Sequence, residues 1–378
     1  MSVSDGAGRM SFRRRILGMV CRNPNMVKTF ARTFYRHEIG ARLDRRSTTG
    51  HAAPPVRIKI NLTRSCNLQC RMCIQDRKDS EKDKFPWNDP ANQLPLTPWV
   101  HLLDQTASFN PLIALTGGEP VLYPYFREFI TAAKERNFVV ELVTNGTLIR
   151  REAEFLVEKG VEFIIVSIDG PEEVHDEIRG VRGSFRRSME GVAALLDARR
   201  KARASGPLVS LNCVLSKTNL SRVEEMMPLA ENLGVDVLNY LHTIFDSPTN
   251  VERHNRIFSE EWAKARGLKI VTPSKPEGEY YETEIGTEDI PALSELMEKV
   301  QRRRGSPMMV NFSPNLSREK LDPYYLDLGH PFTNTCKCLW TDCRILPDGS
   351  VIPCLHVQGG NISRGPFMEV WNCPEIRR

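Results

Sequence analysis

Between residues 54 and 250, short apolar runs alternate with longer amphipathic stretches. Short apolar runs bounded by turn residues are typical of buried strands, and apolar positions spaced by three or four residues are typical of helices. The expected strands are Val56–Leu62, Leu112–Thr116, Phe138–Thr144, Val161–Ile168, Leu208–Leu215 and Val235–Leu241. The expected helices are Pro98–Ser108, Tyr125–Arg136, Arg151–Lys159, Phe185–Arg203 and Leu220–Leu233. Repeated β/α units of this kind predict an α/β fold with a parallel sheet, either open or curled into part of a barrel.

The segments on either side of this region have a different pattern. Residues 1–53 read as a basic extension, helical between Phe12 and Arg46, which ends in the linker His51–Pro55. Residues 251–330 contain charged helical stretches, Glu252–Arg266 and Ile290–Arg304. We expect this second segment to bridge one side of an incomplete barrel and to cover a substrate opening. Residues 331–378 form a separate cysteine-rich segment.

Composition narrows the class of protein and its location. The chain has 378 residues, of which 40% are hydrophobic and 26% charged, values that are ordinary for a globular protein. No run of eighteen apolar residues is present, and the apolar run Ile16–Cys21 is too short for an export signal. Ten cysteines in clusters favour metal binding in a reducing compartment, so we expect a cytoplasmic location.

The formal net charge of +5 comes largely from bases that precede the first strand. These bases match no nucleic-acid-binding motif, so we expect no nucleic-acid partner. A basic helical segment can instead contact anionic lipid. We therefore expect residues 10–46 to give a peripheral contact with a membrane.

Three cysteines directly after the first expected strand are the strongest chemical feature. Cys66, Cys70 and Cys73 lie within eight residues. Three thiolates do not complete a tetrahedral zinc site or a four-cysteine iron–sulfur site. The loop therefore indicates a cluster with one iron left open. A zinc knuckle that takes its fourth ligand from elsewhere remains the alternative.

A glycine pair follows the second expected strand, in the sequence Thr116-Gly117-Gly118-Glu119-Pro120. Glycines at a strand end allow a close approach to the backbone because no Cβ intervenes. Glu119 can pair with a cationic group such as an ammonium. Taken alone, this segment could equally be an ordinary glycine turn.

Together, the two features resemble the signature of the radical S-adenosylmethionine (SAM) enzymes, a CxxxCxΦC loop followed one β/α unit later by GGEP. The resemblance implies that Cys66, Cys70 and Cys73 hold a [4Fe–4S] cluster, and that its open iron chelates the amino and carboxylate groups of SAM. It also implies that the edge formed by Gly117, Gly118 and Glu119 receives the methionine amino group and that Met72 lies against the adenine. Since the resemblance covers residues 55 to 245, we expect a partial (β/α)6 TIM-like barrel.

Residues at and after the later strands supply further candidate contacts to SAM. Asn145 lies in a turn after the third strand, and Ser167 and Asp169 end the fourth, where the resembling family binds ribose hydroxyls. Arg179 suits a carboxylate because its guanidinium can bind bidentately. Val214 belongs to a strand that resembles the family's adenine-side wall. Each of these residues also has a structural reading, as a helix cap, a strand-end turn or a packed side chain.

The tail carries a second cysteine cluster. A Pro-Asp-Gly turn between apolar residues predicts a hairpin that brings Cys343 and Cys354 together. Cys336 or Cys338 upstream and Cys373 downstream can then complete a four-thiolate site. We favour Cys338 over Cys336. Four thiolates suit either an iron–sulfur cluster or structural zinc.

This tail resembles the auxiliary-cluster domain of radical SAM enzymes called SPASM, or its shorter form, Twitch. The resemblance implies one auxiliary iron–sulfur cluster bound by Cys338, Cys343, Cys354 and Cys373, in a small C-terminal β-hairpin domain spanning 331–378. The barrel would span 54–250. A full SPASM domain has further cysteines, so the shorter form is expected.

The two resemblances imply a radical SAM oxidoreductase or maturase-type enzyme. Its partners would be SAM, an electron donor of the flavodoxin or ferredoxin type, and a peptide or small-molecule substrate. Sulfatase-maturing relatives carry an aspartate after the cysteine equivalent to Cys354, whereas this chain has Leu355 and then His356. His356 is therefore the candidate for proton transfer. A non-catalytic iron–sulfur electron carrier and a zinc-binding scaffold are the alternatives.

Overall fold

The computed structural model describes residues 12–46, 50–73, 92–243, 252, 255–256, 259–265, 269–270, 284–303, 306–327, 329–330, 332, 337–353 and 357–373. Within these residues a sheet of nine strands has the order β10-β9-β1-β2-β3-β4-β5-β6-β8. Strands β1 to β6, and β8 beside β6, run parallel. The edge strands β10 and β8 do not pair with each other, so the sheet forms a partial barrel, as expected.

The nine strands include six, β1 to β6, that lie close to the positions that the hydrophobic pattern predicts. Their bounds are Arg57–Asn61 (β1), Leu112–Thr116 (β2), Val140–Thr144 (β3), Phe163–Ser167 (β4), Leu208–Val214 (β5), Val237–Leu241 (β6), Met309–Ser313 (β8), Asp342–Ile345 (β9) and Val351–Ile352 (β10). A separate two-stranded pairing joins Lys269–Ile270 (β7) to Val357–Gln358 (β11).

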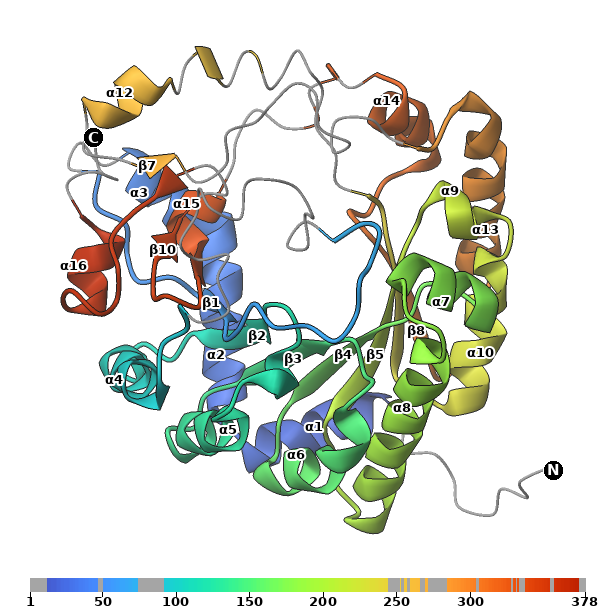
Figure 1. Cartoon of the computed structure of the whole chain (residues 1–378), viewed down its shortest axis with the longest axis horizontal. Coiled ribbons are helices and arrows are strands. Elements are labelled where there is room, and N and C mark those ends of the chain that lie inside the picture. The colour runs from blue at the N-terminus through green and yellow to red at the C-terminus, as the bar shows by residue number, and fades with distance from the viewer. Residues whose placement is uncertain are drawn as a thin grey trace.

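The helices that follow the strands cover the outside of the sheet (Figure 1). They are Leu96–Thr106 (α4), Phe126–Glu135 (α5), Ala153–Lys159 (α6), Glu172–Arg179 (α7), Ser184–Lys201 (α8), Lys217–Leu220 (α9), Met226–Leu233 (α10) and Ile290–Arg302 (α13). The remaining described helices are Phe12–Arg22 (α1), Asn25–Tyr35 (α2), Ala41–Arg46 (α3), Glu260–Lys264 (α12), Leu321–Tyr325 (α14), Cys338–Thr341 (α15) and Phe367–Trp371 (α16). One apolar core fills the space between the outer helices and the sheet.

The N-terminal helices close the amino-terminal end of the barrel, behind the strands in Figure 1. Met19 of α1 and Met26 of α2 are buried against Leu112, Ala114 and Leu208 of the sheet. Charged contacts fix this packing, since Arg15 pairs with Asp236 at 3.2 Å and Asn23 donates to Glu162 at 2.7 Å. The expected single helical region is broken at Asn23–Pro24 because proline cannot continue a hydrogen-bonded helix.

Several elements differ from the sequence expectation. The predicted helix Leu220–Leu233 is divided into α9, a short 3₁₀ turn and α10. Helix α7 and strand β8 were not predicted, because each is short and its apolar positions are few. Much of the predicted helix Glu252–Arg266 lies outside the described residues, whereas Ile290–Arg304 corresponds to α13.

The predicted C-terminal hairpin is confirmed, because β9 and β10 pair antiparallel around a turn in which Gly349 has a φ of +85°. Unexpectedly, β9 also pairs in parallel with β1. The hairpin therefore extends the barrel sheet and covers the edge that β1 would otherwise expose.

Among the residues that the structure describes, no helix is both long and apolar enough to cross a bilayer.

Candidate active site

The cysteine loop crosses the carboxyl end of the sheet, from β1 to α7 (Figure 1). At its far end, the backbone N–H groups of Gln69 and Arg71 donate to the carbonyls of Arg179 and Ile178, at 3.1 and 3.0 Å. A Cβ on Gly180 would lie 2.3 Å from the Gln69 carbonyl oxygen, so this contact requires a glycine. The loop is therefore fixed over the mouth of the barrel at both ends.

The glycine pair after β2 fits directly against the start of the same loop. Gly118 N donates to the Thr63 carbonyl at 2.9 Å, and Glu119 N donates to the Ser65 carbonyl at 2.8 Å. A Cβ on Gly117 would lie 2.4 Å from the Thr63 carbonyl oxygen, and one on Gly118 would lie 2.3 Å from the Ser65 carbonyl oxygen. The close approach that these glycines permit is thus to the cysteine loop itself.

Glu119 is fully buried and ties the end of β2 to the end of β3. Its carboxylate accepts from the Thr144 hydroxyl at 2.8 Å, from Asn145 N at 2.8 Å and from Val121 N at 3.3 Å. Burial raises the pKa of this carboxyl, and the three donors oppose the rise. The residue therefore positions the turn that carries Asn145.

Asn145 lies beside the first cysteine. Its Nδ2 donates to Asn67 Oδ1 at 2.9 Å and stands 4.0 Å from Cys66 Sγ. Asn67 in turn donates to the Thr147 hydroxyl at 2.8 Å. These bonds attach the cysteine loop to the turn after β3, and they aim an amide N–H at the Cys66 sulfur.

Arg179 lies beside the second cysteine. Its Nε donates to Asp169 Oδ2 at 2.6 Å, and its Nη1 stands 3.7 Å from Cys70 Sγ. Asp169 Oδ1 also accepts from Val214 N at 3.2 Å. Burial by itself would lower the pKa of Arg179, but the Asp169 carboxylate and the Cys70 sulfur raise it overall. The guanidinium therefore stays charged and presents an N–H to the Cys70 sulfur.

His175 holds the backbone of Asp169, the residue that pairs with Arg179. It is fully buried, and its Nδ1 accepts from Asp169 N at 3.2 Å. Burial lowers its pKa to about 4, so the ring is neutral at pH 7. Because Nδ1 accepts, the ring proton sits on Nε2.

The three thiols are close enough for their charges to interact. Burial raises the pKa of Cys66, and a negative charge on Glu119, Cys70 or Cys73 would raise it further. Burial also raises the pKa of Cys70, whereas Arg179 lowers it. A cationic centre between the sulfurs would reverse these shifts and favour the thiolates. In the described part of the chain, no three His, Cys, Asp or Glu side chains are already arranged as a metal site.

Comparison with known proteins decides the family. The radical SAM superfamily profile matches residues 60–230, and an iron–sulfur cluster-binding domain, SPASM, matches residues 336–378. The chain belongs to the radical SAM superfamily. It is therefore an enzyme of the radical SAM class, with a [4Fe–4S] cluster and SAM as cofactors and an auxiliary iron–sulfur domain.

Two relatives and one solved structure show the breadth of the similarity. An AdoMet-dependent heme synthase from Methanosarcina barkeri is 29% identical over 86% of this chain and 84% of its own length. A PqqA peptide cyclase from Gluconobacter oxydans is 29% identical over 58% of this chain and 62% of its own length. The crystal structure of Streptococcus suis SuiB bound to SAM shares the fold, with a TM-score of 0.59, 16% identity and coverage of 96% of this chain and 76% of SuiB.

The residues present in this radical SAM enzyme fit an anionic iron–sulfur centre. Three thiols share one loop, and two of their sulfurs face side-chain N–H groups, from Asn145 and Arg179. N–H donors beside cluster sulfurs stabilise added negative charge and tune the reduction potential. Met72, between the second and third cysteines, is 36% exposed and so is available to a ligand.

The other predicted SAM contacts lie on the same end of the barrel. Ser167 is half-buried at the end of β4, level with Asn212 of β5, and Val214 ends β5. Asp169 and Arg179 are engaged with each other, and Arg179 also contacts the cysteine loop at Cys70.

The C-terminal cysteines of the enzyme are only partly described. Cys343 is buried on the helix-covered face of β9, where burial raises its pKa. Cys373 follows α16 and is half-buried, and Cys338 begins α15. Cys336, Cys354 and His356 lie outside the described residues.

Sequence reasoning missed several residues that build the site. Asn67, Thr144, Thr147 and Asn219 all support the loop or the strand ends, and Asn219 donates to the carbonyls of Asp169 and Val214 at 2.8 and 2.7 Å. Asn67 lies inside the cysteine motif, so its position was a usable signal. Asn219 acts through contacts that no local pattern reveals.

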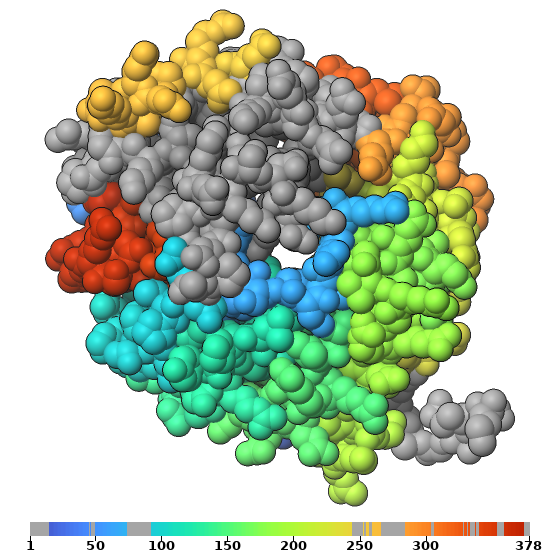
Figure 2. Space-filling model, viewed as in Figure 1, coloured from blue at the N-terminus to red at the C-terminus, as the bar shows by residue number. Residues whose placement is uncertain are grey.

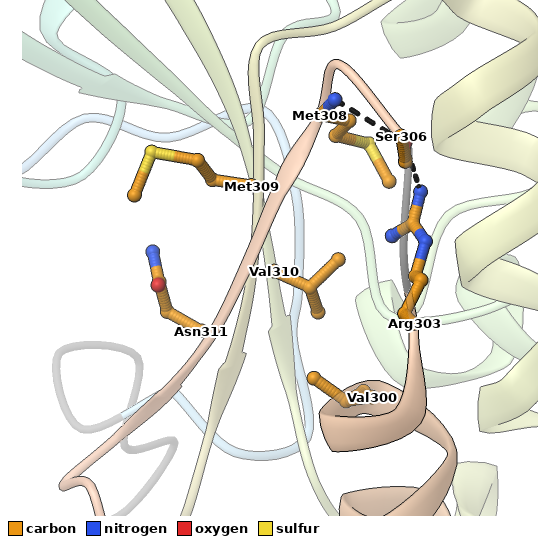
Figure 3. A pocket seen from close by; sticks show the side chains of 7 residues that line it. All are labelled: Val300, Arg303, Ser306, Met308, Met309, Val310 and Asn311. Atoms are coloured by element: carbon orange, nitrogen blue, oxygen red, sulfur yellow. Dashed lines mark hydrogen bonds between the residues drawn. The ribbon is translucent and has the colours of Figure 1, made fainter.

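A separate hollow of about 250 Å³ lies at the open edge, between β8 and the end of α13. Figure 3 shows Met309 and Asn311 on one side of the strand and Val300, Arg303 and Ser306 on the other. None of the predicted site residues lines it, so the chemistry of the family does not belong there.

Proposed function

We propose that this enzyme reductively cleaves SAM and uses the resulting 5′-deoxyadenosyl radical to remove a hydrogen atom from a peptide or small-molecule substrate. The observation that supports this most is the three-thiol loop held over the barrel mouth, with N–H donors aimed at Cys66 and Cys70. When bound, the cluster would supply the electron that cleaves SAM. The protein positions the reactants and excludes water.

In this proposal Cys66, Cys70 and Cys73 ligate the cluster. The SAM site is lined by Met72, Gly117, Gly118, Glu119, Asn145, Ser167, Asp169, Arg179 and Val214. Asn145 and Arg179 would also hold the charge of the cluster by donating to its sulfurs. The neutral His175 would keep the Asp169 backbone in place without adding charge to the site.

We propose that Cys338, Cys343, Cys354 and Cys373 bind one auxiliary cluster, because a single four-thiolate site is the simplest arrangement for the tail. The pairing of β9 with β1 supports a short path between this site and the barrel, since both belong to one sheet. His356 is the candidate acid or base beside it. The auxiliary cluster would accept an electron from the substrate radical or bind the substrate.

Two further expectations, an electron donor and a cellular location, follow from the same chemistry. The reductive step needs a low-potential donor, which we propose to be of the flavodoxin or ferredoxin type. Because clustered thiols and a reducing donor require a reducing compartment, we also propose a cytoplasmic location.

The decisive experiment is anaerobic reconstitution with iron and sulfide, followed by incubation with SAM and dithionite. We expect a brown protein with about eight irons per chain, as two four-iron clusters require, and release of 5′-deoxyadenosine. An iron content of about four atoms per chain would mean that only one cluster is bound, and the auxiliary cluster would then be excluded. Colourless, zinc-loaded protein that releases no 5′-deoxyadenosine would contradict the function as a whole.

We further propose that the outward face of the N-terminal helices contacts an anionic lipid surface. Several large apolar side chains on this face are exposed, Phe34 at 72%, and exposed bases accompany them. The apolar residues are Leu17, Val27, Phe30, Phe34, Tyr35, Ile39 and Leu43, and the bases are Arg22, Lys28, Arg42 and Arg46. An amphipathic helix of this composition suits the interface of an anionic bilayer.

The lipid contact predicts that Phe34→Glu weakens binding to phosphatidylglycerol vesicles by about tenfold or more, since a buried phenylalanine side chain contributes about 1.5–3 kcal/mol. Co-sedimentation measures the binding, and phosphatidylcholine vesicles test the charge requirement. Leu326→Glu is the matched control, because Leu326 is exposed on a different surface. If the chain self-associates and binds neither phosphatidylglycerol nor phosphatidylcholine vesicles, a second copy of the chain covers this face and the lipid contact is wrong.

A further inference from the structure

Charged side chains from three strands point into the barrel. Along β1 and β9 the apolar residues are buried in the helix-covered core, so the residues between them face the concave side of the sheet. These inward residues are Arg57 and Lys59 of β1, Glu141 of β3, and Asp342 and Arg344 of β9. An ion pair between Arg57 and Glu141, which spans β2, confirms that they share this face.

The inward-facing basic side chains outnumber the carboxylates that pair with them. Arg57 pairs with Glu141, and the Asp342 carboxylate accepts from the Thr341 hydroxyl at 2.8 Å. Lys59 has an interaction partner of its own. Among the residues that the structure describes, however, no carboxylate pairs with Arg344. Arg344 is therefore the cation that a ligand would neutralise.

The neighbours of Arg344 make its position unfavourable without an anion. Lys59 and Arg344 are register partners on adjacent parallel strands, which places them about 4.8 Å apart on the same face. Like charges directly opposite each other cost stability. Arg344 is also partly buried. A partly buried cation beside like charges is stabilised when an anion binds.

The cysteine loop lies over the carboxyl end of this concave side of the sheet. Helices α1 and α2 pack across the amino-terminal end, where Met19 and Met26 are buried against the sheet. Figure 2 shows the molecule hollowed near its centre, beside the blue segment that contains β1 and the cysteine loop. From Lys59 to Thr63, where the loop meets the glycine pair, the strand rises about 13 Å at 3.3 Å per residue. A molecule anchored at Arg344 would thus reach upward to the loop.

We propose that Arg344, with Lys59 and Arg57 beside it, forms an anion-binding site that anchors a carboxylate or phosphate group of the substrate at the base of the barrel. This inference rests on the proposed function, because it assigns the substrate of that same site. The anchored group would lie about 13 Å below the cysteine loop, so the reacting carbon is separated from the anionic group by several bonds. The substrate class is an extended molecule with an acidic end.

The test measures binding to the reconstituted full chain in the presence of SAM, with three probes. Citrate and inorganic phosphate are followed by equilibrium dialysis, and coproporphyrin III, a porphyrin with four carboxylates, by the shift of its absorption band. We expect at least one probe to bind once per chain. Arg344→Gln should weaken that binding about 10- to 100-fold, the range for hydrogen bonds to charged groups, and Arg344→Lys should weaken it less.

The control is Arg150→Gln, since Arg150 is exposed and pairs with Glu190 on the surface. It should bind as the wild type does. Ligand-free Arg344→Gln should unfold at or above the wild-type temperature, because the substitution removes like-charge repulsion, whereas a structural role for Arg344 predicts a lower temperature. The most strongly bound probe identifies the source of the anion as a porphyrin carboxylate, another carboxylate or a phosphate.

Two results would overturn the anion site. One is that no probe binds once per chain, and the other is that Arg344→Gln binds as tightly or unfolds at a lower temperature than the wild type. Release of 5′-deoxyadenosine by the same wild-type preparation tests the proposed function independently. A preparation that cleaves SAM but binds no anion removes the anion site and leaves the function in place.

Discussion

Cys70→Ala is expected to abolish the release of 5′-deoxyadenosine from SAM. Cys70 lies in the middle of the cysteine loop, and its sulfur faces the Arg179 guanidinium at 3.7 Å. Without this thiolate, two cysteines remain on the loop, too few to hold a four-iron cluster. The iron bound by the anaerobically reconstituted chain should fall by about four atoms, the content of one cluster, and 5′-deoxyadenosine should fall to the level of a protein-free sample.

The matched control is Cys21→Ala. Cys21 is exposed on α1, far along the chain from the predicted ligands, so its loss should change neither iron content nor SAM cleavage. Circular dichroism of both variants should match the wild type, since neither side chain belongs to the apolar core. Normal SAM cleavage by Cys70→Ala would disprove the assignment of the loop.

Gly118→Ala is expected to have the second largest effect, through geometry and without removal of a ligand. The added Cβ would lie 2.3 Å from the Ser65 carbonyl oxygen and 2.5 Å from that of Arg64. Both contacts are with backbone atoms that hold the cysteine loop, so the loop must move. Overpacking of this kind costs about 1–3 kcal/mol in the free energy of unfolding. A displacement of about 1 Å at a reacting centre slows the reaction by about 100-fold.

Denaturant unfolding and the rate of 5′-deoxyadenosine release measure the two effects of Gly118→Ala separately. Gly365→Ala is the control, because a Cβ at that position meets no atom within 4 Å. It should leave both the stability and the rate close to their wild-type values. If Gly118→Ala is as stable and as fast as Gly365→Ala, the loop does not depend on the glycine contact.

The local features of the site were predictable from the sequence because they depend on short spacings. Three cysteines within eight residues must share one loop, and a glycine pair directly after a strand must lie at the carboxyl end of the sheet. The structure places the two side by side, with Gly118 N bonded to the Thr63 carbonyl. Asn67 lies within the cysteine motif, and Thr147 lies two residues after Asn145. Their closeness in sequence to the predicted site residues makes both of them reasonable candidates for supporting contacts.

The contacts between distant segments were not predictable. Arg179 and Asp169 were predicted to face SAM, but the structure shows them paired with each other beside Cys70, a geometry that depends on how α7 packs. Asn219 carries no sequence signal, since its buried position follows from the packing of α9 against the ends of β4 and β5. The inward bases of β1 and β9 become neighbours only because the C-terminal hairpin joins the first strand of the barrel.

The sequence by itself determined the alternation of strands and helices, the α/β class, the two cysteine clusters and the family, because periodicity and motif spacing are properties of neighbouring residues. The tertiary structure decided that α1 and α2 close the base of the barrel, that β9 extends its sheet, and that Arg344 stands beside Lys59. These arrangements come from burial and strand pairing between segments far apart in the chain, whose free energy depends on the whole fold and not on any local pattern.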